Sequence, residues 1–211
     1  MPRLLVAAVI LNNCGVEYWH GGRRNIAVGE FIRPRNARRR EFSAVERKVE
    51  ANNMRVGYDT DCDPNRIYVT TDLELARGWA MNEILRADGG GALYRVRPEP
   101  TMSIEPDPDY PPTSFSARRA RVLEVVEDPV QMSIDDADRA VCLKYSRWSD
   151  GTAMYDWEGY MLPPPELRSV AADPARYRHL GKWCPVPYGH RVGLLSDSSI
   201  RVVYQQDWPS P

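Results

Sequence analysis

The stretch IYVTTDLELARGWAMNEILRADGGGALYRVRP, residues 67–98, decides which fold the sequence predicts. Its first four residues alternate, which places Ile67 and Val69 on one face of an extended strand. Apolar residues three and four positions apart then predict a helix, and the triple glycine at 89–91 marks its end. A second alternating strand runs on to Pro98. The stretch therefore predicts a strand, a helix and a strand in succession.

Two pairs of polar residues mark the expected helix starts. Thr71 and Glu74 have the spacing of a capping box, in which a hydroxyl and a carboxylate each accept a backbone N–H of the other residue. Ser43 and Glu46 have the same spacing and predict a second, short helix. The arginine-rich segment RPRNARRR at 33–40 precedes it. This segment is either a solvated loop or a contact for the phosphates of a nucleotide or nucleic acid.

Apolar runs elsewhere predict further strands, at 4–11, 121–128 and 200–205. The first run is either a buried strand or the core of a signal peptide, and the missing A-x-A site favours the strand. These elements predict an α+β fold. We expect a core at 1–130 and an irregular extension at 131–211 that packs on this core.

Composition limits the classes of function. The net charge of -1 argues against general nucleic-acid binding, although local basic patches stay open. The four cysteines are widely separated and form no C-x-x-C pair, which predicts neither a zinc site nor a disulfide framework. We therefore expect a cytoplasmic protein without a membrane span, or one delivered to another cell if it is an effector. P-loop and Rossmann glycine signatures are absent.

Three polar side chains are candidates for chemistry, and each is weak by itself. His20 stands between two aromatic residues and a glycine pair in EYWHGGRRN at 17–25, a position that suits a ligand contact or a structural histidine. Tyr68 in its strand suits stacking on a ligand or ordinary packing. Asp107 lies between prolines in IEPDPD at 104–109, where a turn residue is equally expected.

The order of these motifs adds a family resemblance. The chain resembles the rifamycin ADP-ribosyltransferases, small enzymes of the diphtheria-toxin/PARP-like clade with a His-Tyr-acid triad. The resemblance covers a little over half of the chain. It implies an ADP-ribosyltransferase-like split β-sandwich with a few short helices. The blocks that carry it are YWHGG at 18–22, AVGEFIRP at 27–34, IYVTTDLELARGWA at 67–80, GGGALYRVRPE at 89–99 and SIEPDPDYPPTSFSARRARVLEVVED at 103–128.

The resemblance implies a role for each matching residue. His20 would bind the ribose hydroxyls of the nicotinamide half of NAD+, and the backbone of Gly21 would hold the carboxamide. The lack of a Cβ at Gly21 would allow the ligand to approach. Tyr68 would stack on the nicotinamide ring. Thr70 or Thr71 would support the site from the strand end.

Asp107 falls on the acid position of the triad. The family often has Glu-Asp-Asp where this chain has Glu105, Pro106 and Asp107, so Glu105 and Asp109 remain alternatives. Cleavage of the nicotinamide–ribose bond builds positive charge on the ribose, and a fixed carboxylate would stabilise that charge. NAD+ would be the substrate, and no metal is required.

The arginines offer partners for anions. Arg23 and Arg24 follow the glycine pair, and we interpret them as contacts for the pyrophosphate or as solvated surface. The run Arg35 to Arg40 would dock a macromolecular target if the acceptor is one.

Three functions remain open. The first is NAD+-dependent mono-ADP-ribosylation of a small molecule such as a rifamycin-type antibiotic. The second is a toxin or phage-type effector that modifies a host protein or nucleic acid. The third is a non-catalytic module that binds NAD+ or another partner. His179, His190 and Cys184 lie outside the matching blocks, and we expect structural or surface roles for them.

Overall fold

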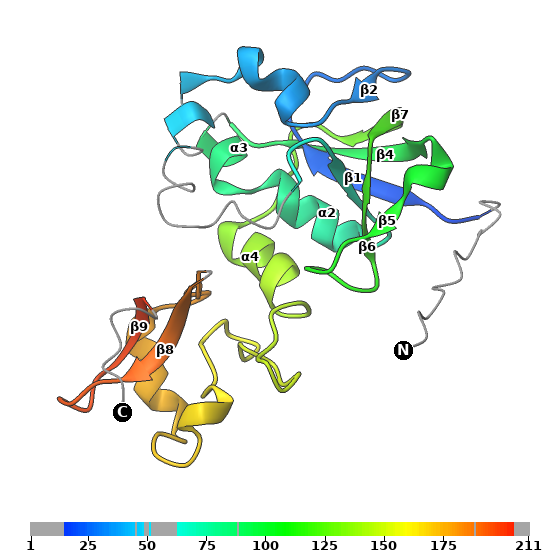
Figure 1. Cartoon of the computed structure of the whole chain (residues 1–211). Coiled ribbons are helices and arrows are strands. Elements are labelled where there is room, and N and C mark those ends of the chain that lie inside the picture. The colour runs from blue at the N-terminus through cyan, green and yellow to red at the C-terminus, as the bar shows by residue number, and fades with distance from the viewer. Residues whose placement is uncertain are drawn as a thin grey trace, which may run out of the picture.

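The computed structural model describes residues 15–44, 46–48, 51, 63–87, 89–187 and 189–204 (Figure 1). The fold is mixed α+β, with a mostly antiparallel sheet and few helices, so the predicted fold class is confirmed at this level. The predicted strand at 4–11 lies outside the described residues, as do Cys14 and Cys62.

The larger of the two sheets in the described residues has seven strands in the order β2-β7-β4-β1-β3-β6-β5. Each neighbouring pair is antiparallel. The predicted strand at Ile67 is confirmed, since Ile67 and Val69 are buried in the core while Tyr68 faces the other way. The strands are β1 (Tyr18–Gly22), β2 (Phe31–Ile32), β3 (Ile67–Thr70), β4 (Ala92–Glu99), β5 (Glu105–Pro106), β6 (Ser114–Ala117) and β7 (Arg119–Glu127).

The sheet is divided at its centre. β1 pairs with β4 along all five of its residues, whereas it pairs with β3 only where Trp19 meets Thr70. Beyond Trp19 the two strands separate, so His20 and Tyr68 border a seam between two halves of the sheet. This seam positions the candidate site.

A helix follows β3, as predicted. The predicted first residue and the predicted length of this helix are wrong. Asp72, and not Thr71, is the N-cap, because its Oδ1 accepts the N–H groups of Glu74 at 3.1 Å and Leu75 at 3.2 Å. Asn82 then interrupts the helix, and its Oδ1 accepts the N–H of Leu85 at 3.0 Å. Two helices result, α2 (Leu73–Ala80) and α3 (Glu83–Ala87).

The predicted capping box at Ser43 is confirmed. The N–H of Ser43 donates to Oε2 of Glu46 at 2.7 Å, and the N–H of Glu46 donates to Oγ of Ser43 at 3.1 Å. Residues 44 and 46–48 are helical. The 3₁₀ helix η1 (Asn36–Glu41) precedes them and contains most of the arginine run.

Residues after 130 form a further layer and a second hydrophobic cluster. Helix α4 (Ile134–Cys142) packs against α2 at Gly78, where a Cβ would lie 2.7 Å from Cγ2 of Val141. In Figure 1, α4 lies between the sheet and the hairpin of β8 (His190–Leu194) and β9 (Ile200–Tyr204). The last predicted strand is thereby confirmed. The remaining 3₁₀ helices are η2 (Thr101–Ser103), η3 (Pro165–Leu167) and η4 (Pro174–Leu180).

The second cluster is centred on the buried Tyr177 and Met161. Among the described residues, no helix combines the length and the apolar character that crossing a membrane requires.

Candidate functional site

A cleft of about 1020 Å³ opens at the seam of the sheet. It is large enough for a drug-sized ligand or a cofactor. The three side chains that the sequence singled out, His20, Tyr68 and Asp107, all line this cleft, although 87 positions separate the first from the last. They come from β1, from β3 and from the loop after β5.

His20 is held in one tautomer. Its Nδ1–H donates to the backbone carbonyl of Tyr68 at 2.8 Å, which leaves Nε2 without the proton. Burial lowers the pKa of His20, the bond to Tyr68 partly opposes this, and the nearby Arg38 charge lowers the pKa as well, which together leave it at about 4. The imidazole is therefore neutral at pH 7, and Nε2 is a hydrogen-bond acceptor.

Tyr68 is fixed at its hydroxyl end. The phenolic oxygen accepts the N–H of Asp63 at 2.9 Å, while the half-buried ring lines the cleft. Thr70, predicted as a cofactor contact, is fully buried, and its hydroxyl donates to the carbonyl of Thr113 at 2.9 Å. Thr70 is not among the described residues that line the cleft. It secures the end of the strand and the loop beside it.

The structure distinguishes the three candidate acids. Asp107 lines the cleft and is only 4% exposed. Its Oδ2 accepts the hydroxyl of Ser114 at 2.7 Å, and its Oδ1 accepts the N–H of Asp109 at 3.1 Å. Asp109 lines the cleft but is exposed. Glu105 is exposed, pairs with Arg66 at 3.0 Å and is not among the described lining residues.

Position 21 requires glycine for a packing reason that could not be predicted from the sequence. A Cβ at this position would lie 1.7 Å from the carbonyl oxygen of Ala76 and 2.7 Å from the nitrogen of Ala80, both in α2. The space that we attributed to an approaching ligand is filled by helix backbone. The missing side chain is therefore needed for α2 to pack on β1.

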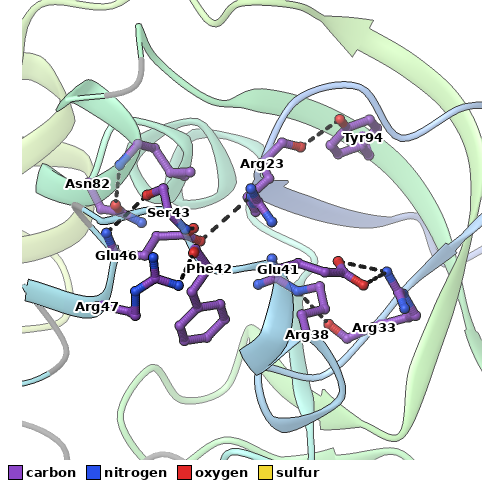
Figure 2. A network of polar contacts seen from close by, with 11 residues as sticks. Arg23, Arg33, Arg38, Glu41, Phe42, Ser43, Glu46, Arg47, Asn82 and Tyr94 are labelled. Carbon is purple, nitrogen blue, oxygen red and sulfur yellow. Dashed lines mark hydrogen bonds and ion pairs between the residues drawn. The ribbon is translucent and has the colours of Figure 1, made fainter.

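The arginines behave differently from one another. Arg24 lines the cleft and forms an ion pair with Asp128. Arg23 also lines it, and its Nε lies 3.6 Å from the buried carboxylate of Glu46 (Figure 2). Of the predicted docking run, Arg35 and Arg38 line the cleft, whereas Arg39 and Arg40 are exposed.

Two aromatic side chains that were not among the predicted site residues also line the cleft. Trp79 and Tyr110 meet edge to face with ring centroids 5.5 Å apart, and both line the cleft. Tyr145, from the segment after α4, also meets Tyr110 edge to face, with ring centroids 5.2 Å apart. Burial raises the pKa of Tyr110 to about 12. In the sequence, the two residues could have been noticed because Trp79 lies within the predicted helix and Tyr110 lies directly after the acidic motif at 104–109.

The remaining candidates have structural contacts. His179 hydrogen-bonds the carbonyl of Ile200 at 2.8 Å through Nε2, and the ring of His190 meets Tyr204 edge to face. Burial raises the pKa of Cys184, which keeps its thiol protonated. Within the described ranges, no group of three or more His, Cys, Asp or Glu residues is arranged to hold a metal ion.

Comparison with known proteins adds no identification. No family model matches the chain, and no curated protein matches its sequence. The features available for assigning a function are therefore those of the cleft: a neutral imidazole, a fixed aromatic ring and a buried carboxylate, with six arginines among the lining residues.

Proposed function

We propose that this protein is an NAD+-dependent mono-ADP-ribosyltransferase with the split β-sandwich of that class. It cleaves the bond between nicotinamide and ribose and transfers ADP-ribose to an acceptor. The observation that carries the proposal is the common cleft of His20, Tyr68 and Asp107, three residues from separate segments. The seam between β1 and β3 supports this assignment of the fold, since these two strands pair with each other at one position only.

The neutral His20 suits a ribose contact. Its Nε2 accepts a hydrogen bond, and a ribose hydroxyl is a donor. Tyr68 supplies a ring whose hydroxyl is already fixed by the N–H of Asp63, so stacking on nicotinamide requires little further ordering.

The backbone of Gly21 suits the carboxamide of nicotinamide. The carbonyl of Tyr68 points toward β1, so the backbone of Thr70, two residues on, faces β1 as well. Thr70 pairs with Trp19, and the backbone groups of Gly21 face the same edge as those of Trp19. Among the described strands, β1 has no partner on this edge at Gly21. The backbone N–H and C=O of Gly21 are therefore available to a ligand amide.

Asp107 suits the stabilisation of positive charge. The leaving nicotinamide makes the ribose oxocarbenium-like, and a carboxylate held by two hydrogen bonds needs little reorganisation to face that charge. The same carboxylate would accept the proton of an attacking hydroxyl or amine. Preorganised groups of this kind typically contribute about 10²–10³ in rate.

The acceptor is either a small molecule, such as a rifamycin-type antibiotic, or a macromolecule. Trp79 and Tyr110 provide an aromatic surface in the cleft for a flat, apolar acceptor. Arg39 and Arg40 are exposed on η1 and favour the alternative of a toxin or effector that docks on a polyanion. Acceptor binding that falls steeply with salt would favour the macromolecule.

The proposal is tested by incubating the protein with NAD+ and measuring free nicotinamide. Mass spectrometry of a cell lysate and of a panel of rifamycin-type antibiotics then locates any added ADP-ribose. The matched control is Asp107→Asn, which removes the charge at nearly constant volume. NAD+ binding without nicotinamide release, in the presence of lysate and panel, would instead identify a non-catalytic module.

A further inference from the structure

A smaller recess of about 260 Å³ adjoins the cleft. Arg23, Arg35 and Arg38 line both cavities, as do His20 and Gly21. Asp107 and Tyr68 line only the larger one. The three arginines therefore stand at the junction between the recess and the cleft, away from the candidate acid.

Two acids near Arg23 and Arg38, Glu46 and Glu41, are shared with other partners. Glu46 is 7% exposed and lies 3.6 Å from Arg23, but it also accepts the N–H of Ser43 in the capping box. Glu41 is engaged by Arg33, whose Nη2 donates to both of its carboxylate oxygens at 2.8 and 2.9 Å. Two like charges that are partly buried favour a bound anion between them.

Arg38 is the least satisfied of these side chains. Its Nε donates to the carbonyl of Arg33 at 3.3 Å, and its Nη1 is buried without a hydrogen-bond partner. Among the described residues, Arg38 forms no ion pair. Burial and the charge of Arg23 lower the pKa of Arg38, and the charges of Glu46 and Glu41 oppose this only in part. A buried donor without an acceptor costs free energy, and the planar fork of a guanidinium matches a phosphate group.

The arginines are held by a supporting shell. The hydroxyl of the fully buried Tyr94 donates to the carbonyl of Arg23 at 2.7 Å. The guanidinium carbon of Arg38 lies 5.9 Å from the ring centroid of Phe42, whose carbonyl accepts Nη1 of Arg47 at 2.6 Å. Figure 2 shows this network around Arg23 and Glu46. Such support distinguishes a built anion site from a solvated surface.

The recess itself is partly apolar. Phe42, Ile84 and Leu85 contribute to its wall, and Asn82 stands at its side. A flat heterocycle with hydrogen-bonding edges suits a pocket that is apolar with one amide. Arg24, which the sequence predicted as a phosphate contact, is less suitable because Asp128 already neutralises it.

We propose that this junction is a nucleoside-diphosphate subsite, in which Arg23 and Arg38 bind the two phosphates and the recess receives the base. The inference deepens the proposed function, since ADP is one half of NAD+. Arg23 and Arg38 both lie outside the blocks that resemble the rifamycin ADP-ribosyltransferases.

Calorimetry with ADP and with inorganic pyrophosphate tests the subsite in the complete chain. We expect Arg38→Ala to weaken ADP binding about 10- to 100-fold, because charge-assisted hydrogen bonds are lost. The control Arg39→Ala removes the neighbouring, exposed charge and should change binding by less than about twofold. Thermal unfolding verifies that each variant is folded.

A second variant separates the base from the phosphates. Ile84→Trp fills the recess from a half-buried position and should weaken ADP while leaving pyrophosphate unchanged. The proposal is overturned if the parent binds neither ligand, or if Arg38→Ala binds ADP as tightly as the parent. An equal loss in Arg39→Ala would also overturn it, by showing general electrostatic attraction.

Nicotinamide release is measured on the same samples. Tight ADP binding without any release from NAD+ would refute the proposed function and retain the subsite. Release that persists unchanged in Arg38→Ala would retain the function and refute the subsite.

Discussion

The two ends of the cleft differ in charge and in construction. The end away from the recess carries Asp107 on a loop whose own groups, Ser114 and the N–H of Asp109, hold the carboxylate. The end at the recess carries Arg23 and Arg38, which belong to different segments and are supported by a helix cap and a buried tyrosine. A dinucleotide with an anionic pyrophosphate and a cationic nicotinamide has the same polarity. The proposed function therefore predicts that charge, as well as shape, orients NAD+ in the cleft.

The largest expected effect is at the acidic end. Asp107→Asn should slow nicotinamide release by about 10²–10³-fold and leave NAD+ affinity within a few-fold, because the carboxylate acts mainly in the transition state. Steady-state release and calorimetry measure the two quantities. Glu105→Gln is the control, since Glu105 is exposed and paired with Arg66, and it should change the rate by less than about threefold. Equal losses in both variants would show that the acid is misassigned.

The next effect concerns His20, which lines both the cleft and the recess. Its pKa is about 4 in the folded protein, below the ordinary value of 6.5. The unfolded chain therefore binds the proton more readily, and folding stability falls as pH drops from about 6.5 to 4. The loss is at most about 3–4 kcal/mol, since one pKa unit corresponds to about 1.4 kcal/mol.

Chemical denaturation of the parent and of His20→Gln across this pH range measures the difference. The parent should lose more stability than the variant. Parallel pH profiles would contradict the burial of a neutral imidazole.

A smaller effect of opposite sign is expected at the basic end. Glu46→Gln keeps an oxygen for the N–H of Ser43 but removes the negative charge beside Arg23. ADP should bind about three- to tenfold more tightly, because a competing charge worth about 1 kcal/mol is lost. Calorimetry at low and high salt checks this expectation. Weaker binding would mean that Glu46 acts by orienting Arg23 and that charge is secondary.

The smallest effect is expected at Tyr145, which connects the extension to the acidic end. Its hydroxyl lies 2.7 Å from Oδ2 of Asp72 and 2.7 Å from Oγ1 of Thr113. Tyr145→Phe should lower the free energy of unfolding by about 1–2 kcal/mol and slow nicotinamide release several-fold. Tyr155→Phe is the control, since the hydroxyl of Tyr155 donates to the carbonyl of Cys184 inside the extension. That variant should lose stability without a change in release.

Local patterns in the sequence were sufficient where neighbouring residues decide the structure. The alternation at Ile67 and Val69 predicted β3, and the spacing of Ser43 and Glu46 predicted the cap that the structure contains. The helix start was displaced by one residue because Thr71 and Asp72 are both good capping residues. Only the fold determines that the carboxylate of Asp72 turns toward the helix.

Local patterns could not predict the contacts between segments that are distant in the sequence. The packing of α2 on Gly21 joins residues 55 positions apart, and nothing local distinguishes it from ligand access. Tyr145 lies 32 positions after Thr113, so its place behind the acidic loop could not be read from either segment. The convergence of His20, Tyr68 and Asp107 was expected only through the family resemblance.

Gly21 and Gly78 have a joint consequence for how the molecule moves. At Gly21, strand β1 lies directly against the backbone of α2. At Gly78, on α2 itself, helix α4 lies directly against the same helix. Side-chain rearrangement at these two contacts has little room to absorb a displacement. A ligand that shifts the strand at His20 would therefore carry the helix with it, and the movement would be transmitted mechanically to the layer that follows residue 130.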